Sequence, residues 1–309
     1  MIKFYKHSEI DREKWNQCIR RARSSSCFVD YDLLSIANPS WAALIEDDYQ
    51  TVMPLPFRKR LCFKYVFSPF FIMRLGVFSS QEIPAEKVKE FVDAIPRQFI
   101  QTELTLNELN DVACLNCDIE EMVGYHLHLH LPYDELQKRF GSNHKKNVKI
   151  ALKHSLSMDD SISTEELVTL FRQNRGRDKN IKIHDADYQT FLAMVSHLQR
   201  QGQIENWGVR DESGKLIAGA CFLIDGNHSY FWFSGRDEQH SQKRAMFFLM
   251  DHYIRLHAGK PIILDFCGSK NENVARFYAG FGATRITYPR ITVRHPLLSP
   301  LIRFYKLFR

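Results

Sequence analysis

The sequence of 309 residues predicts an α/β protein with mixed sheets, built as two halves that share one order of elements. From about Asn206 onward, three strands separated by turns are followed by a helix, a strand, a second helix and a last strand. The first half shows a fainter version of the same order. A chain of this length exceeds the roughly 100 to 200 residues typical of one domain. We therefore interpret the sequence as a divergent structural duplication.

Three short strands open the second half. Apolar runs are separated by Asp211-Glu212-Ser213-Gly214 and by Asp225-Gly226-Asn227, which are turn sequences. Such turns between alternating or apolar runs are typical of antiparallel hairpins. The strands are expected at residues 207–210, 216–224 and 228–234.

Helical spacing of large apolar residues predicts a helix directly after these strands, at residues 241–257. A strand at 261–267, a helix at 271–279 and a last strand at 285–293 complete this half. Two further helices are expected upstream of the strands, at 164–172 and 186–201. The resulting order, β-β-β-α-β-α-β, is preceded by helices.

The first half repeats this order less clearly. Its predicted elements are a helix at residues 10–20, a hairpin of 41–46 and 51–55, a strand at 63–67 and a helix at 84–100. Val88, Phe91, Val92 and Ile95 lie at i, i+3, i+4 and i+7 of the last helix.

A basic segment joins the halves. Helices at residues 133–140 and 143–154 flank Gly141-Ser142, and Lys145, Lys149 and Lys153 lie one helical turn apart on the second helix. We expect a first domain at residues 1–132, a basic helical linker at 133–155 and a second domain at 156–309. The last roughly 20 residues mix apolar and basic side chains, and we expect them to pack back on the first domain rather than on a membrane surface.

Composition restricts the class of protein. The formal net charge of +6 does not by itself indicate nucleic-acid binding. No tract approaches the roughly 20 apolar residues of a spanning helix, and the charged start lacks the apolar middle of a secretory signal. Seven scattered cysteines suit a reducing compartment. These observations predict a cytoplasmic protein.

The helix near the end of the second half carries a recognisable motif. Asn271, Ala275, Tyr278 and Gly282 resemble the Asn-x-x-Ala-x-x-x-Tyr-x-x-x-Gly pattern of the GNAT superfamily of acyltransferases, with one residue of slippage between Asn271 and Ala275. The basic helix at residues 143–149 resembles that of tandem-domain Fem-type aminoacyl transferases of peptidoglycan synthesis. The sequence Asp-Phe-Cys-Gly-Ser at residues 265–269 is similar to the same group.

The resemblance implies two GNAT-like domains in tandem and an N-acyltransferase. An acyl or aminoacyl group would pass from an acyl-coenzyme A or an aminoacyl-tRNA onto a small-molecule or peptide-like amine, by direct attack without a covalent enzyme intermediate. No tightly bound cofactor is implied, and acetyl-coenzyme A or another acyl-coenzyme A would act as a co-substrate.

One loop departs from the GNAT pattern. In GNAT enzymes a glycine-rich loop opens the helix after the third core strand and binds the pyrophosphate of coenzyme A. Here residues 235–245 lack those glycines and contain two carboxylates. Arg236, Lys243 and Arg244 could still supply positive charge to phosphates, although an exposed first helical turn explains Lys243 and Arg244 equally well.

Two residues are candidates for the chemistry. By resemblance, Tyr278 would protonate the leaving group, and the alternative is an aromatic side chain that faces the core. Asp265 lies in an otherwise apolar strand, where an unpaired carboxylate would cost several kcal/mol. It must therefore be paired, exposed at the strand end or functional, and a structural hydrogen-bonding role is favoured over a general base. Cys267 is a possible thiol nucleophile, but a buried inert cysteine is the commoner case.

Candidate binding residues are basic or polar: Lys145, Lys146, Lys149, Arg58, Arg236, Lys243, Arg244, Ser269 and Asn271. The lysine helix either contacts phosphates or is a solvated face. The alternating His126, His128 and His130 fit a polar outer strand face better than a metal site, so no metal is predicted. Two rival functions stay open, namely a non-catalytic binding or scaffold protein with a GNAT fold and a tRNA or nucleic-acid binder that uses the basic helix.

Overall fold

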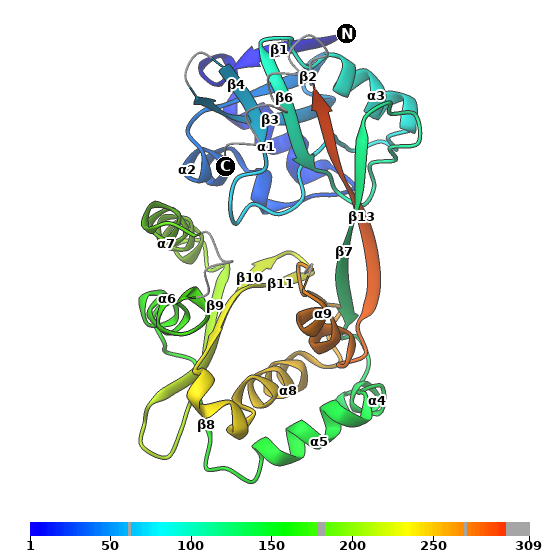
Figure 1. Ribbon diagram of the computed structural model, residues 1–309. Coiled ribbons are helices and arrows are strands. Elements are labelled where there is room, and N and C mark those ends of the chain that lie inside the picture. Colours follow the sequence, from blue (N-terminus) through cyan, green and yellow to red (C-terminus); the bar gives the residue numbers. More distant parts are fainter. Residues whose placement is uncertain (61–62, 178–182, 269–270, 295–309) are drawn as a thin grey trace. The chain divides into compact units, whose positions relative to one another are not determined.

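The computed structural model describes residues 1–60, 63–177, 183–268 and 271–294 (Figure 1). The chain forms two compact units. The first consists of the described residues of Met1–Met122 together with residues 287–294, and the second of the described residues of Val123–Ile286. Within the described residues, no helix is long and apolar enough to cross a membrane.

A single twisted sheet organises the first unit (Figure 1). Its strands pair in the order β1 (Ile2–Lys6), β2 (Trp41–Glu46), β3 (Thr51–Arg60), β4 (Phe63–Phe67), β6 (Phe99–Thr105) and β13 (Thr284–Arg294), and β5 (Phe78–Ser79) pairs with β3. All neighbours are antiparallel except β4 and β6, which are parallel and are connected through α3 (Ala85–Asp93). A parallel pair needs such a crossover, and a helix usually supplies it.

Helices α1 (Arg12–Arg21) and α2 (Tyr31–Ala37) complete this unit, with short 3-10 turns η1 (His7–Glu9) and η2 (Cys27–Val29). Helix α1 begins after Asp11, whose carboxylate accepts hydrogen bonds from the backbone amides of Glu13 and Lys14. The core contains the fully buried Trp15 and Trp41, and the indole N–H of Trp15 donates to the carbonyl of Val29 at 2.8 Å.

The second unit repeats this pairing scheme. Its strands pair in the order β7 (Asp118–His128), β12 (Ile263–Asp265), β11 (His228–Arg236), β10 (Leu216–Asp225), β9 (Ile204–Arg210) and β8 (Ser157–Asp159). Strands β9, β10 and β11 are antiparallel, whereas β11 and β12 are parallel and are connected through η4 (Glu238–Lys243) and α8 (Ala245–His257). The predicted order β-β-β-α-β-α-β is confirmed.

The remaining helices of this unit are α4 (Tyr133–Lys138), α5 (Ser142–Ala151), α6 (Thr164–Gln173), α7 (Asp185–Gln199) and α9 (Glu272–Ala279), with the 3-10 turn η3 (Arg175–Arg177). Helix α8 supplies Leu249, Met250 and Tyr253 to a core that also includes Phe222 and Leu264. The rings of Phe222 and Tyr253 stack at 3.7 Å. Helix α7 packs against strand β11. The ring centroids of Phe191 on α7 and Trp232 on β11 lie 4.9 Å apart.

The two halves of the chain exchange one strand each. Strand β7 follows β6 in sequence but pairs with β12 of the second unit, and β13 follows β12 in sequence but pairs with β6 of the first unit. Both of these pairings are antiparallel. Each unit therefore takes one strand from the opposite half of the sequence.

The units differ from the predicted domain boundaries. Residues 133–155, predicted as a separate linker, fold as α4 and α5 within the second unit. Their position follows from packing, because His144 of α5 is buried against rings that include Phe247 of α8 and Phe281. The described part of the chain after Thr287 belongs to the first unit through the pairing of β13 with β6, and residues 295–309 lie outside the described part.

The predicted helix at residues 84–100 is wrong beyond its first half. Helix α3 ends at Asp93, and residues 99–105 form strand β6. Pro96 has no amide hydrogen to continue a helix, and it disfavours helical conformation at the preceding residue. The alternation of buried and partly buried residues in β6 then follows a period of two, as a strand requires.

Candidate functional site

The two parallel strands of the second unit separate at their carboxyl ends. Strands β11 and β12 pair from His228 with Ile263 to Tyr230 with Asp265. Strand β12 ends at Asp265, whereas β11 continues to Arg236. In α/β proteins, ligands bind at the carboxyl ends of parallel strands. The residues that cluster at this point are therefore the candidates for chemistry.

Asp265 is fully buried at the last position of β12. Its Oδ1 accepts a hydrogen bond from the backbone amide of Cys267 at 2.7 Å. Its Oδ2 lies 3.1 Å from Nε2 of His126, which stands directly opposite on β7. With Asp265 ionised, its oxygens only accept, and the imidazole Nε2–H is then the donor. The sequence requires Asp265 to be paired, exposed at the strand end or functional, and the structure shows that it is paired.

The turn after β12 has unusual backbone conformation. Cys267 has a φ of 61° and Gly268 a φ of 92°, both in the left-handed region. Glycine adopts such angles readily, whereas a residue with a side chain does so at a cost of order 1–3 kcal/mol, and such residues concentrate at functional sites. The thiol of Cys267 is buried and donates to the backbone carbonyl of Asp265 at 3.7 Å. This bond fits the predicted inert cysteine.

Helix α9 carries Tyr278 to the same place. The helix begins after Asn271, whose side-chain oxygen accepts from the backbone amides of Asn273 and Val274 at 2.9 and 3.3 Å. This cap is a structural role for Asn271, a residue that the sequence predicts to bind substrate. Ser269, the neighbouring candidate, lies outside the described residues.

Tyr278 is buried, and its ring stacks on Phe266 at a centroid distance of 4.7 Å. Burial raises the pKa of the phenol well above its usual value, and the charge of Cys267 raises it further, whereas Arg175 lowers it and Asp265 adds a still smaller increase. The phenol is therefore protonated at neutral pH. Within the part of the chain that the structure describes, its hydroxyl has no hydrogen-bond partner, so the proton is available.

The basic helix α5 packs directly on α9. Nε2–H of His144 donates to the carbonyl of Phe277 at 2.9 Å, and the amide of Gly141 donates to the carbonyl of Gly280 at 2.9 Å. Lys146 and Lys149 are exposed, and the ammonium of Lys145 donates to the backbone carbonyl of Lys138 at 2.8 Å. A phosphate contact for these three lysines stays a prediction.

Ion pairs occupy most of the loop that precedes α8. Lys243 is held by Asp211 at 3.2 Å and by Glu212 at 2.7 Å, with 12% of its side chain exposed. Arg236 pairs with the adjacent Glu238 at 3.2 Å. Lys243 and Arg236, which the sequence predicts to bind phosphate, thus form ion pairs with carboxylates of the protein itself.

Arg244 differs from these two residues. It precedes α8 with a φ of 57°, its side chain is exposed, and it forms no ion pair with any residue that the structure describes. In the first unit, the guanidinium of the exposed Arg58 lies over the ring of Phe67 at 4.7 Å. Binding of substrate by Arg58 or Arg244 stays a prediction.

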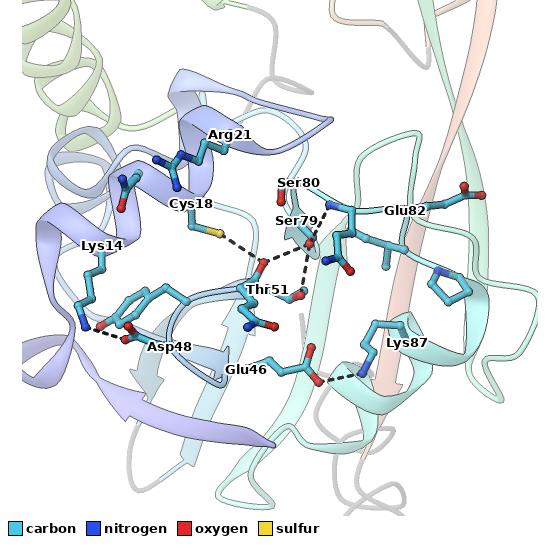
Figure 2. A pocket seen from close by; sticks show the side chains of 16 residues that line it. Lys14, Cys18, Arg21, Glu46, Asp48, Thr51, Ser79, Ser80, Glu82 and Lys87 are labelled. Carbon is cyan, nitrogen blue, oxygen red and sulfur yellow. Dashed lines mark hydrogen bonds and ion pairs between the residues drawn. The ribbon is translucent and has the colours of Figure 1, made fainter.

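A separate polar pocket of about 540 Å³ lies in the first unit (Figure 2). Two of its cations are neutralised, because Lys14 pairs with Asp48 at 2.7 Å and Lys87 pairs with Glu46 at 2.8 Å. Cys18 also lines it, and burial raises the pKa of this thiol to about 11. None of the predicted site residues lines this pocket.

His126 is the residue at the candidate site that sequence reasoning missed. The alternation of histidine and leucine at residues 126–131 correctly separated two faces, because Leu127 and Leu129 are buried and His128 is exposed. The alternation did not show that His126 faces a carboxylate 139 residues away.

Comparisons with known proteins agree with this fold. Residues 142–272 match the acetyltransferase (GNAT) domain family. No curated protein matches the sequence. The crystal structure of FemX superposes with a TM-score of 0.67 at 14% identity, over 94% of this chain and 98% of FemX.

Two other solved structures cover the chain to a similar extent. A conserved protein of unknown function from Bacteroides thetaiotaomicron gives a TM-score of 0.60 at 9% identity, over 96% of this chain and 100% of that chain. L-PGS from Bacillus licheniformis gives 0.57 at 11% identity, over 96% of both chains. Residues 142–272 thus match the GNAT acetyltransferase domain family, and the chain as a whole shares its fold with FemX. The predicted family resemblance and fold class are confirmed.

Proposed function

We propose that the protein is an N-acyltransferase that moves an acyl or aminoacyl group onto an amine at the carboxyl end of β12. The observation that carries the proposal is the buried, protonated phenol of Tyr278, whose ring stacks on Phe266, the residue that follows Asp265 where β11 and β12 part. The GNAT domain match at residues 142–272 supports the same class of reaction.

The reaction needs no covalent enzyme intermediate. The amine nitrogen attacks the carbonyl carbon of a thioester or ester donor, and the new N–C bond forms as the amine loses a proton. The tetrahedral intermediate then collapses, the C–S or C–O bond breaks, and the leaving thiolate or alkoxide takes the proton of Tyr278. A positioned acid of this kind contributes about 10²–10⁴-fold to rate.

Two donor classes fit the proposal. Acyl-coenzyme A is a thioester and aminoacyl-tRNA an ester, and both carry phosphates. The loop before α8 lacks the glycines of a pyrophosphate site, and the charge of Lys243 is neutralised. Arg244, Lys146 and Lys149 are exposed cations that would contact a phosphate-bearing donor.

Steady-state assays with acetyl-coenzyme A, longer acyl-coenzyme A species and charged tRNA, against panels of amine acceptors, test the proposal. We expect turnover with one donor class, and a fall in kcat of about 10²–10⁴-fold for Tyr278→Phe. Tyr188→Phe is the matched control, since Tyr188 is another buried tyrosine of the same unit and lies on α7. Absence of turnover with every donor would refute the proposal.

A further inference from the structure

We propose that His126 is the general base of this site and that Asp265 is its positioning residue. The inference rests on the acyl transfer proposed above and adds a residue to it. His126 would take the proton from the acceptor amine on Nδ1, while Nε2–H stays bonded to Asp265. No feature of the sequence alone pairs these two side chains.

The contact fixes which imidazole nitrogen is free. Nε2 of His126 donates to Oδ2 of Asp265 at 3.1 Å, so a neutral imidazole carries its unshared electron pair on Nδ1. Nδ1 has no partner among the residues that the structure describes. His126 keeps 12% of its side chain exposed, whereas Asp265 is fully enclosed. The free nitrogen belongs to the side chain that solvent and substrate can reach.

The burial of Asp265 explains why its carboxylate needs the imidazole of His126. A carboxylate out of contact with water is stable only when it is paired and hydrogen-bonded, and here the Cys267 amide and His126 supply both bonds. When His126 gains a proton, the adjacent negative charge stabilises the imidazolium. A carboxylate also orients the imidazole base in hydrolases of unrelated folds, although there it bonds Nδ1–H and Nε2 is the base.

The first unit offers an internal comparison. Its strand β6 occupies the place that β12 occupies in the second unit, and each is paired with a strand from the opposite half of the chain. Glu103 of β6 is bonded there to Arg290 of β13. A guanidinium holds a carboxylate but does not release its proton in proteins. The second unit has at this place a cross-strand pair of a carboxylate and an imidazole, and an imidazole, unlike a guanidinium, can both accept and release a proton.

Three titratable side chains of the described structure surround the imidazole besides Asp265. His228 of β11 lies edge-on at 6.2 Å and stacks on Tyr230 at 5.8 Å. His128 lies two residues along β7, opposite Ile263 rather than opposite a carboxylate. Burial lowers the pKa of His128, and the charge of His126 lowers it further. Variants of the individual histidines are therefore needed to assign a change in the pH–rate profile to His126.

The proton balance of the step closes within the site. The amine nitrogen forms its bond to the acyl carbon as its proton passes to Nδ1 of His126. The leaving group takes the proton of Tyr278 as the C–S or C–O bond breaks. His126 then returns its proton through solvent to the phenolate, and both residues recover their starting states. No oxidant, reductant or metal takes part.

His126→Gln separates this role from a structural one. The glutamine amide can still donate to Asp265, but it cannot accept a proton as a base. We expect kcat/KM to fall by about 10²–10⁴-fold, with the ascending limb of the pH–rate profile lost and Tm retained. His128→Gln, on the same face of the same strand, is the control and is expected to keep both rate and profile. A His126→Gln enzyme with the wild-type rate and pH profile would overturn the assignment.

A second measurement does not depend on turnover. Nitrogen-15 NMR of histidine-labelled protein reports which ring nitrogen carries the proton. We expect His126 to show protonated Nε2 and bare Nδ1 at neutral pH, and Asp265→Asn to change that signal while His128→Gln preserves it. A proton on Nδ1 of neutral His126 would overturn the inference even in an active enzyme. Wild-type protein inactive with every donor would instead refute the acyl-transfer proposal, and the NMR result would still decide the tautomer.

Discussion

Replacing Gly280 with alanine tests the contact that joins the basic helix α5 to the helix of Tyr278. A Cβ atom at Gly280 would lie 1.9 Å from Cε1 and 2.2 Å from Nδ1 of the His144 ring. Gly280 has φ −70° and ψ −14°, which alanine adopts without strain. The whole penalty of Gly280→Ala therefore comes from displacing His144.

The structure sets the size of that penalty. His144 is buried among Phe247, Phe277 and Phe281, so it cannot swing into an empty space without disturbing them. Forcing extra volume into a packed core costs about 1–3 kcal/mol. Loss of the bond from His144 to the carbonyl of Phe277 adds about 0.5–1.5 kcal/mol. The smaller backbone entropy of unfolded alanine returns about 0.4–1 kcal/mol. The free energy of unfolding is thus expected to fall by roughly 0.5–4 kcal/mol.

Gly141→Ala is the matched control. Gly141 contributes the other half of the same contact, but a Cβ there would lie 3.7 Å from the nearest atom, the carbonyl oxygen of Gly280, at ordinary van der Waals distance. Its bond to Gly280 uses the backbone amide, which alanine keeps. We expect no loss of stability for this variant.

Urea unfolding of the whole protein measures the change in the free energy of unfolding for both variants. Hydrogen exchange of the α5 and α9 amides in the native protein then assigns the change to the second unit. In a His144→Ala background, Gly280→Ala should lose most of its penalty, because the ring that obstructs the methyl group is gone. Equal stability of Gly280→Ala and Gly141→Ala would refute the reasoning.

Two further changes test buried charges. The pKa of Asp211 lies below its usual range because of hydrogen bonds from Ser213, so its contribution to stability is present above the unfolded-state pKa of about 3.9 and is lost as pH falls below it. Asp211→Asn should flatten the acid side of a urea-midpoint profile more than Glu212→Gln, whose carboxylate is exposed, and an unaltered profile would contradict this. Tyr133→Phe removes the hydroxyl that donates to the buried Asp251, and should lower the free energy of unfolding by about 1.5–3 kcal/mol in urea titrations, since the acceptor is a carboxyl group. An unchanged midpoint would show that this bond contributes nothing.

Local sequence signals predicted the second unit well. The turn Asp225-Gly226-Asn227 placed a hairpin between β10 and β11, and the structure pairs Asp225 with His228 across it. The local signals failed in the first half, where helical spacing of apolar residues concealed the end of a helix. Apolar spacing from Val88 to Ile95 continued a helix past Pro96 into a segment that pairs as β6. Turn residues act over a few positions, whereas strand pairing depends on partners elsewhere in the chain.

At the candidate site, too, the sequence predicted local features but not contacts between distant residues. Chemistry alone required a partner for Asp265, because an apolar strand cannot hold a lone carboxylate. Spacing could not name His126, since the two residues are joined only by the exchange of β7 into the second sheet. Lys243 shows the converse case, because its sequence position suited a phosphate and its neutralisation by Asp211 depends on a contact 32 residues away.

The strand exchange also determines which part of the chain holds a complete site. The GNAT match at residues 142–272 contains Asp265 but neither His126 nor Tyr278. His126 enters on β7, the strand that follows the first half of the duplication, and Tyr278 lies beyond the end of the match on α9. A second half that began after β7 would leave the buried Asp265 with the Cys267 amide but without its imidazole. The duplicated fold therefore does more than repeat a unit, because the strand that each half donates supplies the partner for a carboxylate in the other.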